Sequence, residues 1–580
     1  MVIIGSFHTT MLFVFQLLYS LFIISYSMTN SMNLSSSPII ITKKTEDNPL
    51  PIQTLFKLPS PIPNWPPGEG FASGTIDLGG LELCQITSFT QIWATHEGGP
   101  EGLGATFFEP SSIPEGFFTL GFYGQPNNSP LFGSVVAAKD VIGEALRPPI
   151  NYTLVWSSES SKINQDGNAY IWLPIPPDGY KAVGHVITSS PDKPSLDKIR
   201  CVRSDFTDVC ETDAFIWGED ANGLNFYGLR PTNRGIGALG LSAGTFVAHN
   251  GVNNPMPITC LKNVNGNLTS MPNLSQIQAL VQAYSPVIYF HPDEQYLPSS
   301  VSWFFQNGAL LYTKGDESNP VSIEPTGSNL PQGGSHDGAY WLDLPVDQAA
   351  KEQVKKGNLQ DAGVYLHVKQ VLGATFTDIA MWVFCPFNGP SKAKVGIINV
   401  SLGKIGEHVG DWEHVTLRIS NFNGELKSVY FSQHGAGVWV DAPNLEFQSG
   451  NKLVAYAALH SHAMSPKAGV VLQGNGGIGI KMETGKGKMV FDTGSKYLVV
   501  GAEYLGSEVV ELPWLNYARE WGPKLDYSID GELKKVEKLI PGFLKAKFEK
   551  IIRGLPREVL GEEGPTGPEM KNNWNGDENV

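Results

Sequence analysis

Cysteine and charge are both scarce in this sequence. Its 580 residues include 5 cysteines, none of them in a CxxC pair, which argues against a zinc ribbon and against a disulfide-rich scaffold. Cys201 and Cys210 could close a short loop through a disulfide, although two buried thiols are the favoured interpretation. Only 17% of the residues are charged, and the net charge of −15 argues against binding of the whole protein to nucleic-acid phosphates.

Glycine, proline and aromatic residues are plentiful instead. The chain has 63 Gly, 41 Pro and 11% aromatic residues, a composition that excludes a disordered chain, a coiled coil and a polytopic membrane protein. Few stretches are rich in Ala, Glu, Lys and Leu, so many short strands joined by turns are expected. The length exceeds that of one ordinary domain and predicts two or more folded units.

The two ends of the chain carry apolar or amphipathic segments. Met11–Ile24 is an apolar run of 14 residues with the length of a signal-peptide core, but no Lys or Arg precedes it. A cleaved signal, an anchor and a start at a later methionine all stay open. An endomembrane or vacuole-associated location is favoured, and secretion is the alternative if the run is a signal core.

Glu532–Arg553 has apolar residues at helical intervals and seven Lys or Arg against three Glu. We expect this basic amphipathic segment to pack on the body as a helix interrupted at Pro541-Gly542. Contact with an anionic membrane surface is the alternative. The last twenty residues, rich in Gly, Pro, Glu and Asn, are expected to be irregular.

One pattern in the first half recurs three times. In each copy, an apolar residue and a tryptophan are followed by two glycines five residues apart. Each copy is expected to form a small antiparallel sheet, and three such sheets would bury their apolar faces around the tryptophans as a β-prism. The copies contain Trp93 with Gly116 and Gly121, Trp156 with Gly179 and Gly184, and Trp217 with Gly235 and Gly240.

The second copy resembles a known repeat. Gly179–Val186 and Ile199–Val202 are similar to the repeats of the large vacuolar-sorting lipid-transfer proteins of the "thirteen" type. Those repeats bind adaptor peptides, so the resemblance implies a recognition module. A purely structural prism is the alternative interpretation.

Residues that can carry chemistry concentrate in the second half, where 8 of the 12 histidines lie between His291 and His462. Read as a strand, Glu407–Ile419 places Asp411 and Glu413 at the start of an inward-facing apolar stripe. Two unpaired buried carboxylates are costly, so a cation, a proton or hydrogen-bond donors must accompany them.

Imidazoles are available near this acidic pair. His408 precedes it, and His434, His460 and His462 lie at the ends of later predicted strands. Carboxylate and imidazole ligands without a thiol suit Mg, Ca, Mn or Zn, so one interpretation is a divalent metal pocket at the mouth of a β-sandwich. A hydrogen-bonded polar cluster without a metal is the other. Asp293 and Glu294 are expected to cap a turn, with contact to the pocket as the alternative.

Two stretches carry a specific family resemblance. Tyr284–Ser300 (YSPVIYFHPDEQYLPSS) and Gly410–Val415 (GDWEHV) resemble the plant vacuolar protein sorting-associated family of the "sixty-two" type. The likeness extends from about Phe56 to Pro568. It implies a link to vacuolar sorting and no agreed biochemical activity.

The heptapeptide Glu407–Glu413 also resembles the Gly-His-Arg-His-Asp-Trp-Glu hallmark of the necrosis- and ethylene-inducing-like proteins, with four of seven positions identical. The family's preceding acidic ligand falls near Asn388, where an amide weakens the charge of a site. The resemblance implies a jelly-roll sandwich whose loops could meet a lipid or glycan headgroup. It further implies metal-ligand roles for His408, Asp411, Glu413 and His434.

These patterns together predict an all-β protein with a C-terminal amphipathic helical tail. The expected metal ligands are His408, Asp411, Glu413, His434 and His460, with Asn388, His462 and Asp293 as further pocket candidates. The expected divisions are a signal-like or anchor segment with a linker (1–54), a β-prism (55–252), a linker (253–271), a jelly-roll-like β-sandwich (272–523) and the basic tail (524–580).

Function is predicted on the same residues. No Gly-x-Ser-x-Gly elbow and no Cys/His nucleophile pair is found, so no catalytic residue is assigned. The leading hypothesis is a non-enzymatic binding protein of vacuolar or endomembrane traffic, with a membrane-associated or protein partner. One alternative is a secreted defence or membrane-damaging protein that docks a lipid or glycan headgroup. Another is a metal-dependent hydrolase with Asp411 or Glu413 as base.

Overall fold

The computed structural model describes residues 49–218, 224–249, 255–395, 398–433, 436–475, 478–555 and 557–578. Residues from Leu50 onward form one compact unit. The apolar run Met11–Ile24 lies outside the described residues. No helix in the described part of the chain is long and apolar enough to span a membrane.

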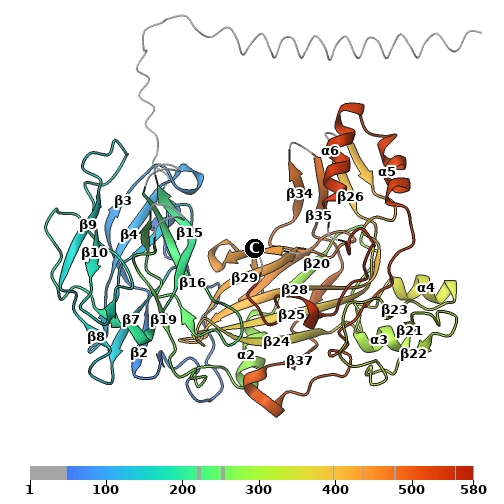
Figure 1. Cartoon of the computed structure of the whole chain (residues 1–580), viewed down its shortest axis with the longest axis horizontal. Helices are drawn as coiled ribbons and strands as arrows, with labels where there is room; N and C mark the ends of the chain where they lie inside the picture. Colours follow the sequence, from blue (N-terminus) through green and yellow to red (C-terminus); the bar gives the residue numbers. More distant parts are fainter. Residues whose placement is uncertain are drawn as a thin grey trace, which may run out of the picture. The chain divides into compact units, whose positions relative to one another are not determined.

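Short antiparallel strands make up the first half (Figure 1). They are β1 (Thr75–Asp77), β2 (Leu81–Ile86), β3 (Phe89–Ala94), β4 (Ala105–Pro110), β5 (Phe118–Thr119), β6 (Tyr123–Pro126), β7 (Val135–Asp140), β8 (Leu146–Arg147), β9 (Asn151–Ser157), β10 (Tyr170–Ile175), β11 (Tyr180–Lys181), β12 (Val186–Thr188), β13 (Cys201–Arg203), β14 (Thr207–Asp208), β15 (Cys210–Gly218), β16 (Asn225–Pro231), β17 (Gly240–Leu241), β18 (Val247–His249) and β19 (Cys260–Lys262).

Each repeat contributes two small sheets rather than the single sheet expected. The tryptophan-bearing strands lie in the sheets β3-β4-β6, β12-β10-β9 and β15-β16-β18. The remaining strands form β1-β2-β7-β5, β11-β13-β8 and β14-β19-β17. Turns rich in glycine and proline interrupt each repeat, so that its strands separate into two sheets. The repeat is therefore present, while a β-prism is not confirmed.

The three repeated tryptophans meet in one apolar core, as their spacing predicts. The ring centroids of Trp93 and Trp217 lie 5.7 Å apart, and both side chains are buried. Trp156 is half-buried and packs against both, at 5.8 Å and 5.9 Å. The shared core thus holds the three repeats together.

Close backbone approach explains the last glycine of the pattern in two of the repeats. A Cβ on Gly121 would lie 2.6 Å from the Cα of Gly184, so neither position has room for a side chain. In the third repeat Thr245 lies against Gly184. Gly240, the last glycine of the third copy, instead lies in β17.

One disulfide joins Cys210 in β15 to Cys260 in β19, with the Cα atoms 5.4 Å apart. The prediction of a disulfide between Cys201 and Cys210 is therefore wrong, and the prediction of a free thiol at Cys210 is wrong as well. Cys201 lies in β13, which pairs with β8 and β11 in a different sheet from that of Cys210. Its thiol is free and buried.

The second half is built on a six-stranded sheet, β30-β29-β28-β25-β24-β37 (Figure 1). Its bounds are β24 (Val364–Val371), β25 (Phe376–Asn388), β28 (His408–Ser420), β29 (Leu426–Gln433), β30 (Ala436–Asp441) and β37 (Tyr497–Gly501). Every neighbouring pair is antiparallel except β24 with β37.

A smaller sheet packs on one face of the large sheet and makes a sandwich with it. It contains β20 (Val287–Phe290), β31 (Phe447–Gln448), β32 (Lys452–Ala457), β33 (Met464–Ser465) and β36 (Val490–Asp492). Helix α2 (Leu274–Tyr284) joins the same core with four apolar side chains, and its N-cap Asn273 forms a capping box with Gln276. The predicted β-rich sandwich is thus confirmed.

The opposite face of the large sheet is covered as well. A second apolar core on that face includes side chains of β24, β25 and β28. It is closed by α3 (Val301–Gln306), α4 (Gln348–Lys355) and the small sheet of β21 (Leu310–Thr313), β22 (Val321–Ser322) and β23 (Tyr340–Asp343). The middle strands β25 and β28 are consequently buried on both faces. Polar side chains on β28 therefore lie inside the protein.

The basic segment near the C-terminus forms two helices, α5 (Ile529–Glu537) and α6 (Gly542–Arg553). The break covers residues 538–541 and ends directly before Gly542, next to the predicted interruption at Pro541-Gly542. Both helices pack on a sheet of β26 (Lys392–Val395), β27 (Ile398–Ser401), β34 (Gly469–Asn475) and β35 (Ile478–Thr484). Packing on the body is thus confirmed.

Loss of the disulfide provides a first test of this fold. We expect Cys210→Ser with Cys260→Ser to lower the free energy of unfolding by about 4 kcal/mol, because the bridge restricts a long loop in the unfolded chain. Denaturant unfolding measures the change, and reduced wild type should match the double variant. Peptide mapping without reduction should recover Cys210 linked to Cys260; a peptide linking Cys201 to Cys210 would contradict the structure.

Candidate functional site

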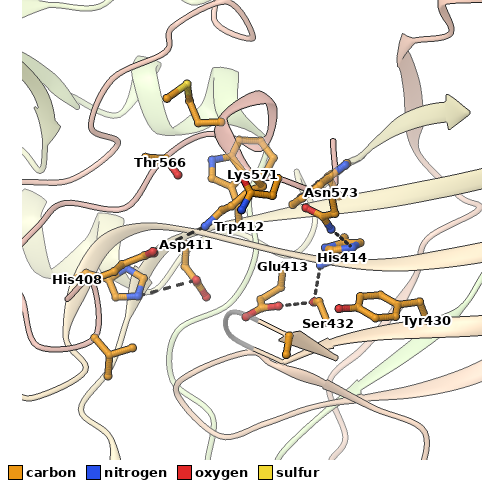
Figure 2. Close-up of a pocket in the computed structure, with 16 residues that line it drawn as sticks. His408, Asp411, Trp412, Glu413, His414, Tyr430, Ser432, Thr566, Lys571 and Asn573 are labelled. Carbon is orange, nitrogen blue, oxygen red and sulfur yellow. Dashed lines mark hydrogen bonds and ion pairs between the residues drawn. The ribbon is translucent and has the colours of Figure 1, made fainter. Parts of the chain in front are cut away.

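The polar site forms where β28 separates from β29. Strand β25 pairs with β28 along nearly its whole length, but β29 pairs with β28 only from Val415 onward. At the point of separation the backbone N–H of His414 donates to Oγ of Ser432, at 3.0 Å. The opening leaves a cavity of about 270 Å³ beside the first half of β28 (Figure 2).

Gly410 sets the course of β28 at this cavity. Its φ is +72°, and a Cβ there would lie 2.5 Å from the carbonyl oxygen of Trp521. Beyond it the strand alternates as predicted. Figure 2 shows Asp411 and Glu413 on one side of the strand and Trp412 on the other.

Asp411 has buried polar partners on neighbouring segments. One of its carboxylate oxygens lies 2.7 Å from Nδ1 of His462, whose Nε2 lies 2.8 Å from the carbonyl oxygen of Tyr296. Cys385 is directly opposite Asp411 on β25. One ligand atom from each of Cys385, Asp411 and His462 lies within 4.8 Å of the other two. Among the described residues, this is the group whose atoms are close enough to share a metal ion.

The hydrogen bonds determine how many protons His462 carries. Both ring nitrogens face acceptors, so both carry hydrogen when no metal is bound. Burial by itself lowers the pKa of His462, but Cys385 and Asp411 outweigh it and raise the pKa well above its usual value. Burial likewise opposes ionisation of Asp411, but the hydrogen bond from His462 overrides it and lowers the pKa of Asp411. The result is a buried ion pair.

The two remaining acidic groups are held neutral. Burial raises the pKa of the Cys385 thiol to about 11. Burial and the neighbouring charge of Asp411 raise the pKa of Glu413 well above its usual value, although Oγ of Ser432 donates a hydrogen bond to it. Asp411 is thus the ionised member of the acidic pair and Glu413 the protonated one.

His408 completes the floor of the pocket. Its Nε2 is 4.0 Å from an oxygen of Asp411, too long for a hydrogen bond. Its Nδ1 is buried and has no hydrogen-bond partner among the described residues. An imidazole nitrogen of this kind is available to a ligand or to a water in the cavity.

The C-terminal segment covers the pocket. Thr566 and residues 570–573 line the cavity from the side opposite β28 (Figure 2). Lys571 brings a positive charge that favours the ionised forms of Asp411 and Glu413. A segment far along the chain therefore completes the site.

Glu578 anchors this segment by a buried carboxylate. Thr416 donates to it at 2.5 Å and Asn573 at 2.6 Å. His414 lies 3.1 Å away and Lys369 lies 3.6 Å away. Burial by itself raises the pKa of Glu578, but His414 and Lys369 outweigh it and lower the pKa far below the usual value.

Asp577 adds a second anchor next to the first. It lies 3.2 Å from Arg418 of β28 and 2.8 Å from Arg234 of the third repeat. Arg418 is also paired with Asp378 of β25, at 2.8 Å. The end of the chain, expected to be irregular, is thus tied to two strands of the large sheet and to the first half.

The structure brings together some of the predicted site residues and separates others. His408, Asp411, Glu413 and His462 share the pocket and its floor. His460 is turned away, with Nδ1 2.9 Å from the carbonyl oxygen of Pro390. His434 lies outside the described residues. Metal-ligand roles for these residues stay predictions.

Asn388 and Asp293 take structural or exposed positions. Asn388 is buried and donates to the carbonyl oxygens of Gly389 and Gly406. Asp293 is exposed, 3.9 Å from His291. Of the two residues expected to cap the turn, Glu294 does so: its carboxylate accepts the backbone N–H groups of residues 295, 296 and 460.

Sequence reasoning missed Cys385 and the end of the chain. A site without a thiol was expected, because Cys385 has no neighbouring cysteine and lies in an apolar run. Its place opposite Asp411 follows from strand register, which one sequence does not reveal. Glu578 lies 162 positions from Thr416, so no local pattern could have pointed to it.

The sequence profile of the family described as vacuolar protein sorting-associated protein 62 matches residues 52–578. The chain belongs to this family. The resemblance carried by Tyr284–Ser300 and Gly410–Val415 is thereby confirmed, and the family's name suggests association with the vacuole or endomembranes. No curated protein matches the sequence.

Solved structures resemble part of this family member. GNIP1Aa from Chromobacterium piscinae is 20% identical with a TM-score of 0.25, and the match covers 34% of this chain and 40% of that one. NLPPya in complex with glucosamine is 14% identical with a TM-score of 0.18, and the match covers 33% of this chain and 66% of that one. Necrosis and ethylene inducing protein 2 from the causal agent of cocoa's witches' broom disease is 15% identical with a TM-score of 0.15. That match covers 32% of this chain and 76% of the other.

The last of these is a necrosis- and ethylene-inducing protein, from the group whose hallmark the heptapeptide resembles. This chain spans less than half the length of GNIP1Aa. At TM-scores of 0.25 or below, the likenesses say nothing about the function of this chain.

Glu413→Gln should make stability less dependent on pH. Unfolded Glu413 loses its proton above about pH 4.3, whereas the folded protein retains it. Its contribution to stability is therefore full below that pH and falls as the pH rises toward the raised folded-state pKa. We expect Glu413→Gln to raise the free energy of unfolding at pH 8 by about 1 kcal/mol or more, measured by denaturant unfolding at several pH values. An unchanged pH profile would mean that Glu413 is ionised in the folded protein.

Glu578→Ala should release the C-terminal segment. The substitution leaves Lys369 and His414 without their carboxylate, and removal of one partner of a buried pair costs about 3 kcal/mol. Unfolding measurements should show this loss, and hydrogen exchange should increase across residues 566–578. Glu115→Ala, at an exposed glutamate, is the matched control and should change neither quantity. Unchanged exchange in Glu578→Ala would rule out the anchoring role.

Proposed function

We propose that this family member is a non-enzymatic binding protein that recognises a membrane-associated or protein partner in vacuolar or endomembrane traffic. A divalent metal ion in the polar pocket would organise its recognition surface. The observation that carries this proposal is the buried group of Cys385, Asp411 and His462 beside the cavity. A metal ion bound by these three side chains would take the place of the protons that Cys385 and His462 now carry.

The donor set favours zinc among the four ions that the sequence suggested. Thiolate, imidazole and carboxylate together suit Zn better than Mg, Ca or Mn, which prefer oxygen ligands. Nε2 of His462 is fixed by the carbonyl of Tyr296, so Nδ1 is directed at Asp411. Metal-binding histidines are commonly oriented by such a second hydrogen bond.

Protonation opposes metal binding at low pH. Both the Cys385 thiol and the ring of His462 must lose a proton to act as ligands, and the pKa values of both groups are raised. Zinc would therefore compete with protons in this group, and its affinity should increase with pH.

The state of the acidic pair favours binding over hydrolysis. A hydrolase with Asp411 or Glu413 as general base needs one of them ionised and free to accept a proton. Glu413 is held protonated, and Asp411 is already bonded to His462. These observations support a non-enzymatic role for the pocket.

The disulfide between Cys210 and Cys260 favours a second candidate, the secreted defence or membrane-damaging protein. Disulfides persist mainly in oxidising compartments such as the secretory route and the cell exterior. Asn151 and Asn399 lie exposed in glycosylation sequons, whereas the buried amide of Asn127 donates to two backbone carbonyls. Sequencing of the mature N-terminus separates the two candidates, since cleavage after the apolar run supports secretion.

Metal analysis tests the leading proposal. Chelator-treated wild type should regain about one zinc per chain, with tighter binding at pH 8 than at pH 6. Asp411→Asn should bind zinc at least about tenfold more weakly, because an amide cannot supply the same charge to the ion. Elemental analysis and titration calorimetry measure both effects. Asp293→Asn, at an exposed aspartate, is the matched control; equal zinc content in Asp411→Asn and wild type would reject the site.

A further inference from the structure

Helices α5 and α6 have one face buried and one face free. Leu533 and Val536 of α5 and Phe548 and Ile552 of α6 are buried in a core shared with β26, β27 and β35. Figure 1 shows α6 beside β26 and β35. The apolar residues at helical spacing form this buried face. Most of the other side chains of the two helices and of their connection point outward.

Two large apolar side chains project where α5 passes into α6. Leu539 is 62% exposed and Phe543 is 84% exposed, the largest fraction among the exposed large apolar side chains. Ile540 between them is buried, so the connection is packed on the body while these two side chains are presented outward. Two large apolar side chains this exposed, four positions apart, contribute little to the core and are available for contact with another surface.

Lysines surround this apolar tip. Five of them form no ion pair among the described residues: Lys534, Lys538, Lys545, Lys547 and Lys550. Phe543, Lys547 and Lys550 are spaced to lie along one face of α6, away from the buried Phe548 and Ile552. Among the acidic side chains of the two helices, Asp530 and Glu549 pair with Arg553 and Glu532 pairs with Lys535, which leaves Glu537. A chain with a net charge of −15 thus has a local positive surface around two apolar side chains.

We propose that the α5–α6 tip docks on an anionic phospholipid surface. Leu539 and Phe543 would enter the headgroup layer, and the unpaired lysines would face the lipid phosphates and carboxylates. Apolar insertion combined with electrostatic attraction is how amphipathic surface elements bind membranes. An acidic protein partner would pair with the lysines but would not require a Phe and a Leu held out in water.

This surface gives the proposed function its membrane contact but uses none of the pocket residues. Zinc content measured on the same variants distinguishes a failure of the docking surface from a failure of the metal site. Normal zinc binding without vesicle binding would overturn only the docking surface, and vesicle binding without zinc would overturn only the metal site.

Vesicle sedimentation with the full chain tests the docking surface. We expect binding to vesicles of phosphatidylcholine with about 30% phosphatidylserine, weakened by salt, and little binding to phosphatidylcholine alone. Leu539→Ser with Phe543→Ser should lower the partition coefficient at least about tenfold. Lys538→Gln, Lys545→Gln and Lys547→Gln together should lower it by about fivefold per lysine.

Matched controls use exposed residues elsewhere. Val346→Ser with Val510→Ser replaces apolar side chains that are 70% and 76% exposed, and Lys57→Gln, Lys181→Gln and Lys356→Gln replace three exposed lysines. Both sets should bind like wild type. The inference is overturned if phosphatidylserine does not promote binding, or if the tip variants bind as well as their controls. Binding to polyglutamate that survives Leu539→Ser with Phe543→Ser would assign the surface to an acidic protein instead.

Discussion

Asp411 carries a negative charge inside a sandwich whose adjoining side chains are mostly apolar. An uncompensated carboxylate there would cost several kcal/mol. The ring of His462 supplies the compensating charge, and the neighbouring Glu413 stays protonated because a second negative charge would have no partner. His462 itself has φ of +54°, a strained backbone for a residue with a Cβ, in a turn that is held by both ring nitrogens.

The end of the chain meets the same constraint on the other face of β28. Lys369 is almost fully buried, and Glu578 is the carboxylate that neutralises it. Because the same segment also closes the cavity above Asp411, the charge balance of the sheet and the shape of the site depend on one stretch of chain. The pocket is therefore an assembly of β25, β28, β29, a turn of the smaller sheet and the C-terminal segment.

The first half is stabilised differently, by aromatic packing and a covalent bridge. Its core is built around Trp93 and the two equivalent tryptophans, and the disulfide lies in the third repeat. Arg234 of that repeat also pairs with Asp577, so the repeat region contributes to holding the C-terminal segment in place. The vacuolar protein sorting-associated protein 62 profile extends across both halves, in keeping with this shared dependence.

The sequence alone determined the features that depend on short-range spacing. The period of two placed Asp411 and Glu413 on the inner face of β28, the threefold spacing of the tryptophans indicated a shared core, and the helical period identified α5 and α6. These patterns hold because neighbouring side chains on a strand or helix keep fixed directions.

Only the tertiary structure decided which groups neutralise one another. His462 rather than His460 reaches Asp411, Cys260 rather than Cys201 pairs with Cys210, and Glu578 enters the sheet from the end of the chain. Each of these pairings joins residues on different strands or segments, about fifty or more positions apart. Their geometry follows from strand register and from the path of the connecting loops, and neither is encoded by the spacing of residues along one element.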